Sequence, residues 1–409
     1  HEVSMAVAAP ERWAKVDVWN RPDADKWERD PPPLTDEQRT RVLELLGDAG
    51  RLPTDDSGRS GNADRSTDAG PQGPMDRQAE VGDQGGDAPR EIHEVQPPRI
   101  SQDYYTDMPP STYERYFVRD QNRPIPLFDG PPAREQVAQG YVGDCGVLAT
   151  VGAVAGPRPD DIRNAIKDVG DGKFEVTLHD VTPATRQDPV ARPTGETTTY
   201  VVSDDIPVAP GLPGRPPAGV QASTCGWPAL LEKTVAAQDQ TWEPKQKSDW
   251  DNAWTNVHKY FVDNERFGKG LPPSPQDAPT GYDRIDIGST AYQRADLLAE
   301  LTGEEAEVRD IPDEQQGEQA LLDEFRDRLD AGKPVLVGTR GMLSGSELMP
   351  YGVYAGHAYE VTKIDGDKIH LRNPWGRRHP APMEATTFWE YFRWYNQDGS
   401  RSGQYTTLK

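Results

Sequence analysis

The sequence predicts an α+β fold, because helical and strand patterns alternate along most of its length. Residues 147–155 form an unbroken run of small and apolar residues, which is typical of a buried helix. Residues 174–178 and 198–202 alternate between apolar and polar side chains, the pattern of strands with one buried face. Residues 356–376 contain two further strand patterns around an Asp-Gly-Asp turn, which predicts a hairpin.

The first 99 residues divide into two segments of different composition. Residues 1–48 hold three tryptophans, a Thr35/Gln38 capping box and a short leucine-rich helix pattern. We expect this segment to pack against the core, or alternatively to act as a pro-segment or a docking element. Residues 49–99 contain no Phe, Trp or Tyr and are rich in Gly, Asp, Arg and Pro, which predicts a flexible linker.

Residues 100–237 are expected to form the first structured unit. A helix is predicted to begin at Cys145 and another over residues 227–237, whose Leu230, Leu231 and Val235 share one face. The proline- and threonine-rich residues 182–197 between the two predicted strands are expected to form a loop.

Residues 238–285 are polar, apart from scattered aromatic residues, and we interpret them as an insertion between two units. The second unit spans residues 286–409. Its patterns predict helices over residues 291–301 and 314–331, then a buried strand over residues 334–338. A final helix is expected in the aromatic-rich stretch that follows Trp375.

Composition excludes several classes of protein. The 409 residues are enough for two or three domains. A net charge of −23 argues against binding to nucleic acid or to an anionic membrane, but it permits calcium. No run approaches the roughly 18 apolar residues needed to span a bilayer, and no signal peptide is visible. Location therefore stays open between the cytoplasm and secretion as an effector.

Cys145 is the candidate nucleophile. Gly140 and Gly143 shape a close loop before it, and the predicted helix places it at a helix N-terminus, where a thiolate is favoured. Gln139, six residues earlier, is a candidate oxyanion donor together with the backbone N–H of Cys145. The alternative is that Cys145 is a small buried hydrophobe. Cys225 lacks this context, and a bridge between the two cysteines would silence the nucleophile.

His357 is the candidate base that a cysteine nucleophile requires. It follows Gly356 and opens the first strand of the predicted hairpin, whereas Asn373 closes the second strand before Pro374. The turn lays these two ends side by side, so that Asn373 can hold His357 in one tautomer. The order Cys, His, Asn is that of a papain-type triad. Trp375 is expected to shield the pair from water.

The blocks QGYVGDCGVLAT (residues 139–150), GHAYEVTKI (356–364) and LRNPWG (371–376) resemble the active-site blocks of the calpain family of cysteine proteases. Four further segments are similar to family segments in the same order, over residues 200–207, 226–233, 295–303 and 337–340. The resemblance covers roughly residues 100–409. It implies a papain-like fold of two lobes, a helical lobe with Gln139 and Cys145 and a β-rich lobe with His357 and Asn373.

This resemblance implies limited cleavage of protein or peptide substrates in a cleft between the lobes. Gly143, Gly146, Gly356 and Trp375 are expected to lie along that cleft. The chemistry requires no cofactor, although calcium is a candidate regulator because family members often bind it in the protease core. No segment has an EF-hand loop, so no calcium ligands are assigned.

Two alternatives stay open, and Gly146, which stands where the family usually has tryptophan, favours only the first of them. The first is a catalytically inactive calpain-like module that binds its partner. The second is a secreted effector or toxin protease, kept inactive until calcium or a partner aligns the lobes and controlled by an inhibitor or immunity protein.

Overall fold

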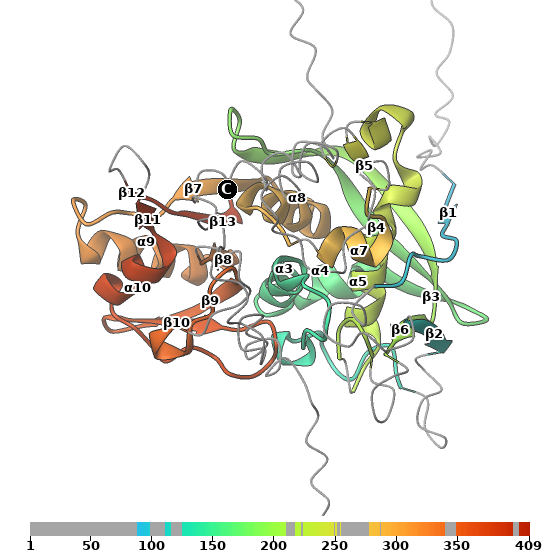
Figure 1. Cartoon of the computed structure of the whole chain (residues 1–409), viewed down its shortest axis with the longest axis horizontal. Helices are drawn as coiled ribbons and strands as arrows, with labels where there is room; N and C mark the ends of the chain where they lie inside the picture. Colours follow the sequence, from blue (N-terminus) through green and yellow to red (C-terminus); the bar gives the residue numbers. More distant parts are fainter. Residues whose placement is uncertain are drawn as a thin grey trace, which may run out of the picture.

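A computed structural model describes residues 88–98, 111–115, 125–209, 217–221, 224–248, 250–251, 254, 278–286, 288–339, 349–395 and 401–409. These residues form a mixed α+β fold, in which an antiparallel sheet is combined with several helices (Figure 1). The α+β class expected from the sequence is therefore confirmed. The N-terminal segment 1–48 and most of the predicted linker lie outside the described residues.

The described strands build one large sheet in the order β10-β9-β8-β13-β7-β5-β4-β3, with β1 (Arg90–Glu91) beside β5. All its pairings are antiparallel except that of β1 with β5. Besides β1, the strands of this sheet are β3 (Ile166–Gly170), β4 (Lys173–Thr182), β5 (Val190–Ser203), β7 (Ala306–Asp310), β8 (Val335–Gly338), β9 (Ala358–Asp365), β10 (Lys368–Arg372) and β13 (Gln404–Leu408). Two smaller pairs join β2 (Thr112–Arg115) to β6 (Asp205–Val208) and β11 (Trp394–Tyr395) to β12 (Arg401–Ser402).

β5 is longer than the sequence predicts. It begins at Val190, so residues 190–197 extend a strand where a loop was expected, and that part of the loop prediction is wrong. Its first two residues, Val190 and Ala191, are buried and pair with β7, whereas the later residues pair with β4. Pro193 and Gly195 weaken the intrinsic strand preference of this part, so pairing with these two neighbours stabilises it as a strand.

The helices expected over residues 227–237 and 291–301 lie where the sequence predicts them, whereas the two short helices over residues 159–165 and 281–286 were not predicted. α5 (Trp227–Ala237) has the expected bounds, and α8 (Ala291–Thr302) begins at a Thr290/Gln293 capping box and ends at Gly303 in the left-handed conformation. The remaining helices are α3 (Cys145–Ala155), α4 (Pro159–Ala165), α7 (Gly281–Asp286), α9 (Glu318–Asp330) and α10 (Ala385–Phe392), with short 3-10 turns η3 (Arg134–Gln136), η4 (Gln238–Thr241) and η5 (Pro350–Gly352). α9 begins four residues later than expected.

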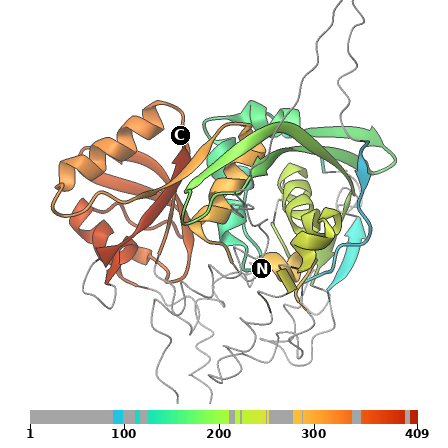
Figure 2. The ribbon, with the colours of Figure 1, turned by 90° about the horizontal axis from the view of Figure 1, so that it is seen from above.

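α3 lies in the middle of the molecule and belongs to the first of two hydrophobic clusters (Figures 1 and 2). One cluster packs α3, α5 and α8 against β3, β4 and β5, and the other packs α9 and α10 against β8, β9, β10 and β13. Ala149 and Ala153 of α3 meet Leu336 of β8 and Ala358 of β9. Because these side chains are mostly small, the first turn of α3 comes close to the start of β9.

Residues 88–98 were expected to belong to the flexible linker, and the structure corrects that boundary. Arg90 pairs with Tyr200 and Glu91 with Val201 in β5, while Val95 is fully buried in the core. The hydroxyl of Tyr113 donates to the Val95 carbonyl at 2.7 Å. Val95 and the partly buried Ile92 pack in the core, so this end of the segment buries enough apolar surface to offset its ordering entropy.

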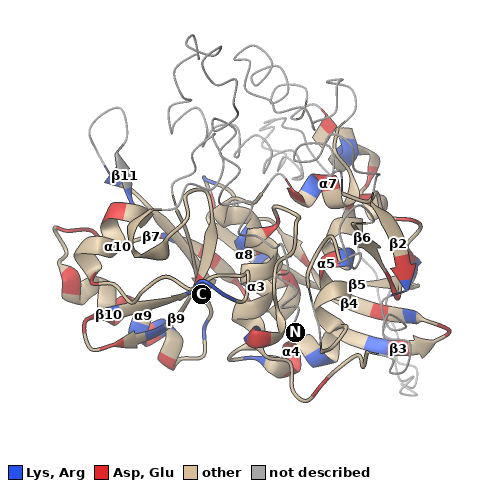
Figure 3. Ribbon diagram, turned by 60° about the horizontal axis from the view of Figure 1, so that its bottom comes forward, with Lys and Arg blue, Asp and Glu red and all other residues tan. Residues whose placement is uncertain are grey.

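Acidic and basic residues are interspersed over the described helices and strands (Figure 3). Several ion pairs join distant segments, such as Lys409 with Glu305 at 2.7 Å and Lys173 with Glu91 at 2.9 Å. These groups are well exposed, so each pair stabilises the fold only weakly, by about 0–1 kcal/mol.

Candidate active site

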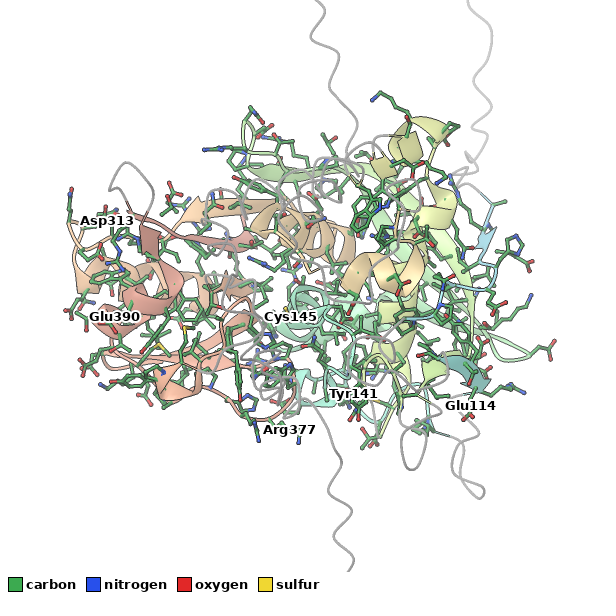
Figure 4. All side chains as sticks on the ribbon, viewed as in Figure 1. Glu114, Tyr141, Cys145, Asp313, Arg377 and Glu390 are labelled. Atoms are coloured by element: carbon green, nitrogen blue, oxygen red, sulfur yellow. The ribbon has the colours of Figure 1, made fainter. Side chains whose placement is uncertain are left out.

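Cys145 is the first residue of α3, as the sequence predicts, and it lies near the centre of the molecule (Figure 4). Burial acts to raise the pKa of its thiol. That effect is outweighed by the charge of His357, by hydrogen bonds from His357 and the Ala358 N–H, and by the charge of Arg294, so the thiol pKa is lowered. These groups favour the thiolate, the nucleophilic form of cysteine.

His357 and Asn373 meet across the β9–β10 hairpin, with 2.9 Å between Nε2 and Oδ1. The Trp375 N–H donates to the same oxygen at 3.0 Å, and the Asn373 Nδ2 donates to the Arg378 carbonyl at 3.3 Å. Because these contacts orient the amide with its oxygen toward the ring, Nε2 must carry a hydrogen and donate. His357 also forms a hydrogen bond with the Cys145 thiol, and because Nε2 is used by Asn373, we assign that bond to the other ring nitrogen, Nδ1.

Aromatic rings enclose the His357 imidazole. The ring centroids of Trp375 and Tyr359 lie 4.9 Å from that of His357, and the centroid of Tyr354 lies 6.3 Å away. His357 and Asn373 are both buried. Hydrogen bonds in such a low-dielectric environment are stronger than in water, so the His–Asn contact is well protected.

Thr339 positions His357 from the end of β8. Its backbone N–H donates to the His357 carbonyl at 2.9 Å, and its Oγ1 accepts from the His357 N–H at 2.9 Å. The same hydroxyl donates to the Tyr354 carbonyl at 2.7 Å. Sequence reasoning missed Thr339, although it lies in one of the family-like segments.

Gln139 lies beside the Asn373 block, because its backbone N–H donates to the Pro374 carbonyl at 2.8 Å. Its side chain is buried, and Nε2 donates to the Val142 carbonyl at 2.7 Å. A primary amide has two N–H groups. One hydrogen of Nε2 therefore holds the loop before Cys145, and the second is the donor that an oxyanion role would use.

The structure gives a reason for glycine at each of the three glycine positions expected along the cleft. A Cβ at Gly143 would lie 2.6 Å from the Asp286 carbonyl oxygen, and the Gly143 N–H donates to the Asp286 carboxylate at 2.5 Å. Gly356 has φ +62°, a left-handed conformation that favours glycine. Gly146 is buried, and a Cβ there would lie only 1.7 Å from the Oγ of Ser289. Ser289 thus fills the space beside Gly146.

A pair of buried carboxyls lies directly behind Cys145. Asp144, the N-cap of α3, and Glu232 of α5 are each 1% exposed. Burial and the charge of the neighbouring Glu232 raise the pKa of Asp144 well above its ordinary range. Glu232 also accepts from the Val220 N–H at 2.8 Å. A proton held between the two carboxyls keeps this pair from carrying two charges.

A comparison with protein-family models found no match to the chain, and a comparison with curated proteins found none. In the described part of the chain, no three His, Cys, Asp or Glu side chains gather in a group that could hold a metal ion. No described helix is both long enough and apolar enough to cross a membrane.

Proposed function

We propose that this chain is a cysteine endopeptidase of the calpain family, with a papain-like core of two lobes. The observation that supports this most strongly is the contact of Cys145, at the start of α3, with His357, whose Nε2 faces the Asn373 amide oxygen. Sequence order, tautomer and helix placement agree with a Cys-His-Asn triad. The lobes would correspond to the two hydrophobic clusters on either side of the Cys145–His357 contact.

The proposed reaction is acyl transfer through a thioester. The Cys145 thiolate attacks the scissile carbonyl carbon, and the resulting oxyanion accepts hydrogen bonds from the Gln139 amide and the Cys145 N–H. The His357 imidazolium protonates the amide nitrogen as the C–N bond breaks, which releases the amine product. Neutral His357 then takes a proton from water, and the hydroxide attacks the thioester, which releases the carboxylic acid product and restores the Cys145 thiolate beside the His357 imidazolium.

Limited cleavage of protein substrates, rather than general digestion, is the substrate class that the family resemblance suggests. Calcium would act on this enzyme as a regulator and has no part in the bond-breaking steps. Carboxylate and carbonyl oxygens from dispersed segments can supply a calcium site, so calcium is included as a variable in the test.

The direct test incubates the purified protein with casein, with and without millimolar calcium, and follows fragments on a gel. Cys145→Ala should abolish cleavage, whereas Cys225→Ala, a change at the other cysteine, should leave it intact. Fragments made only by proteins that retain Cys145 would support the endopeptidase, and the calcium lane would reveal its regulation.

The two alternatives give different results in the same experiment. An inactive binding module would produce no fragments and would show no labelling of Cys145 by a thiol-reactive peptide analogue. An effector awaiting a partner would be labelled only weakly, and its labelling would rise on addition of the partner or on removal of residues 1–48.

A further inference from the structure

Arg294 of α8 reaches into the space beside the candidate nucleophile. Its Cδ lies 3.5 Å from the point where a Cβ at Gly146 would be, and its Nη2 lies 3.3 Å from the equivalent point at Gly338. Gly146 directly follows Cys145 on α3, and Gly338 pairs with Ala358, the residue after His357. The guanidinium therefore lies between the start of α3 and the start of β9.

The guanidinium of Arg294 is buried, with 6% of the residue exposed, and its hydrogen bonds are few. Nη1 donates to the Ser289 carbonyl at 3.1 Å, while Nε is buried without a partner. In the described part of the chain no carboxylate forms an ion pair with it. Since an unpaired buried cation is strongly unfavourable, a compensating negative charge is expected nearby.

Cys145 is the group whose charge acts on Arg294. Burial lowers the pKa of Arg294 to about 10, and the charge of Cys145 opposes that change. Arg294 therefore stays protonated at neutral pH. The interaction is reciprocal, since the Arg294 charge also acts to lower the pKa of the Cys145 thiol.

We infer that Arg294 is a positioning residue that holds Cys145 as a thiolate, and that the thiolate is the counter-charge of this buried guanidinium. The inference rests on the proposed function, in which Cys145 is the nucleophile. Gly146 and Ser289 make the arrangement sterically available, because a larger side chain after Cys145 would occupy the space that Ser289 and the Arg294 stem fill.

The other titratable groups facing Cys145 reinforce the role of Arg294. Asp144 belongs to the proton-sharing pair with Glu232, and burial raises the pKa of Tyr359 far above neutrality, so Asp144 and Tyr359 are uncharged near pH 7. Among the described residues, the groups whose positive charge acts on the sulfur are then His357 and Arg294. Arg294 stays charged whether or not the His357 imidazole carries a second proton, so the thiolate keeps a counter-charge when His357 is neutral.

The test measures the rate of Cys145 alkylation by iodoacetamide against pH, followed by mass spectrometry of the intact protein and its peptides. Cys225 is 0% exposed and serves as an internal reference for unfolding. Arg294→Met retains the aliphatic stem without the charge, and Arg294→Lys retains a charge. We expect Arg294→Met to raise the apparent thiol pKa by about one pH unit or more, with roughly ten-fold slower alkylation near neutral pH, and Arg294→Lys to return the profile toward wild type.

Arg393→Met is the matched control. Arg393 is also buried, at 8% exposed, but it pairs with Glu314 in the other hydrophobic cluster. This variant should lose thermal stability without moving the alkylation profile. If Arg294→Met folds and its alkylation rate depends on pH as in the wild type, Arg294 contributes only packing and the inference is wrong.

A second variant keeps the inference testable if Arg294→Met does not fold. In His357→Ala, Arg294 is the remaining described residue whose positive charge acts on the sulfur, so the thiol pKa should stay below its ordinary value of about 8.5. A thiol that titrates at or above that value in His357→Ala would overturn the inference. Alkylation requires no substrate, so it tests Arg294 independently of cleavage. If the thiol pKa is lowered and depends on Arg294, but the protein does not cleave casein, the proposed protease function is refuted and the role of Arg294 is supported.

Discussion

The amide oxygen of Asn373 accepts two hydrogen bonds, from Nε2 of His357 at 2.9 Å and from the Trp375 N–H at 3.0 Å. The second bond fixes which end of the amide faces the imidazole. Asn373 thus determines the tautomer of His357 and not only the position of its ring.

Asn373→Ala should reduce peptide cleavage on the order of 10- to 100-fold, because either imidazole nitrogen could then carry the proton. The measurement is kcat and KM for a fluorogenic peptide, with the main loss in kcat. His370→Ala, a substitution on β10 of the same hairpin, is the control and should cleave at the wild-type rate. Equal kcat values for Asn373→Ala and wild type would exclude the tautomer role.

Thr339→Val should destabilise the protein by about 1–3 kcal/mol, because it leaves the buried His357 N–H and the Tyr354 carbonyl without their hydroxyl partner. Urea unfolding gives this difference. Thr339→Ser keeps the hydroxyl and is expected to recover most of the loss. If the serine and valine variants unfold at the same urea concentration, the hydroxyl contributes nothing measurable.

Gly146→Ala should destabilise the fold by about 1–3 kcal/mol, since the new methyl group overlaps Ser289. In a Ser289→Gly background the same substitution should be nearly neutral, because the obstructing side chain is gone. The coupling energy of this double-mutant cycle is the measured quantity. An alanine substitution with the same effect in both backgrounds would show that the two residues do not meet.

Glu360 makes stability depend on pH in a direction opposite to that of most carboxylates. Burial raises its pKa to about 7, although Arg134, whose Nη2 lies 3.0 Å from Oε1, and Arg372 oppose the change. In the unfolded chain the pKa is about 4.3. At pH values between about 4.3 and 7, Glu360 keeps its proton in the folded protein but has lost it in the unfolded chain. The stability of the fold therefore falls as pH rises and levels off above about pH 7.

Glu360→Gln should therefore gain stability relative to wild type as pH rises from about 4.5 to 7, by up to about 3 kcal/mol. Denaturant unfolding of both proteins across this interval measures the difference. Glu232 and Glu300 also have pKa values raised to about 7, so the difference between the proteins is informative and the wild-type curve alone is not. A difference that stays constant with pH would contradict the assignment.

The main features of the candidate site could be predicted from sequence because they depend on local structure. Cys145 starts a helix with an apolar pattern of its own, and His357 and Asn373 are separated by sixteen residues in one hairpin. Each of these elements has a local signal, in periodicity or in turn residues.

Arg294, Ser289 and Thr339 could not be predicted, because their roles arise only when α8 and β8 pack against α3 and β9. Arg294 lies 149 residues after Cys145. No local sequence pattern distinguishes it from a solvent-exposed helix residue. The beginning of β5 was missed for a similar reason, since Val190 and Ala191 pair with β7, which is remote in sequence. Tertiary contacts override weak propensity at such positions.

β13 is the strand that joins β8, β9 and β10 to the rest of the described sheet, because it lies between β8 and β7. Its residues, Gln404–Leu408, are made after every other described element. A ribosome-bound chain that has not yet exposed them contains both Cys145 and His357, but it lacks the strand that joins their two parts of the sheet. Synthesis itself would thus delay assembly of the site, and a chain stopped before residue 404 should show slow alkylation of Cys145.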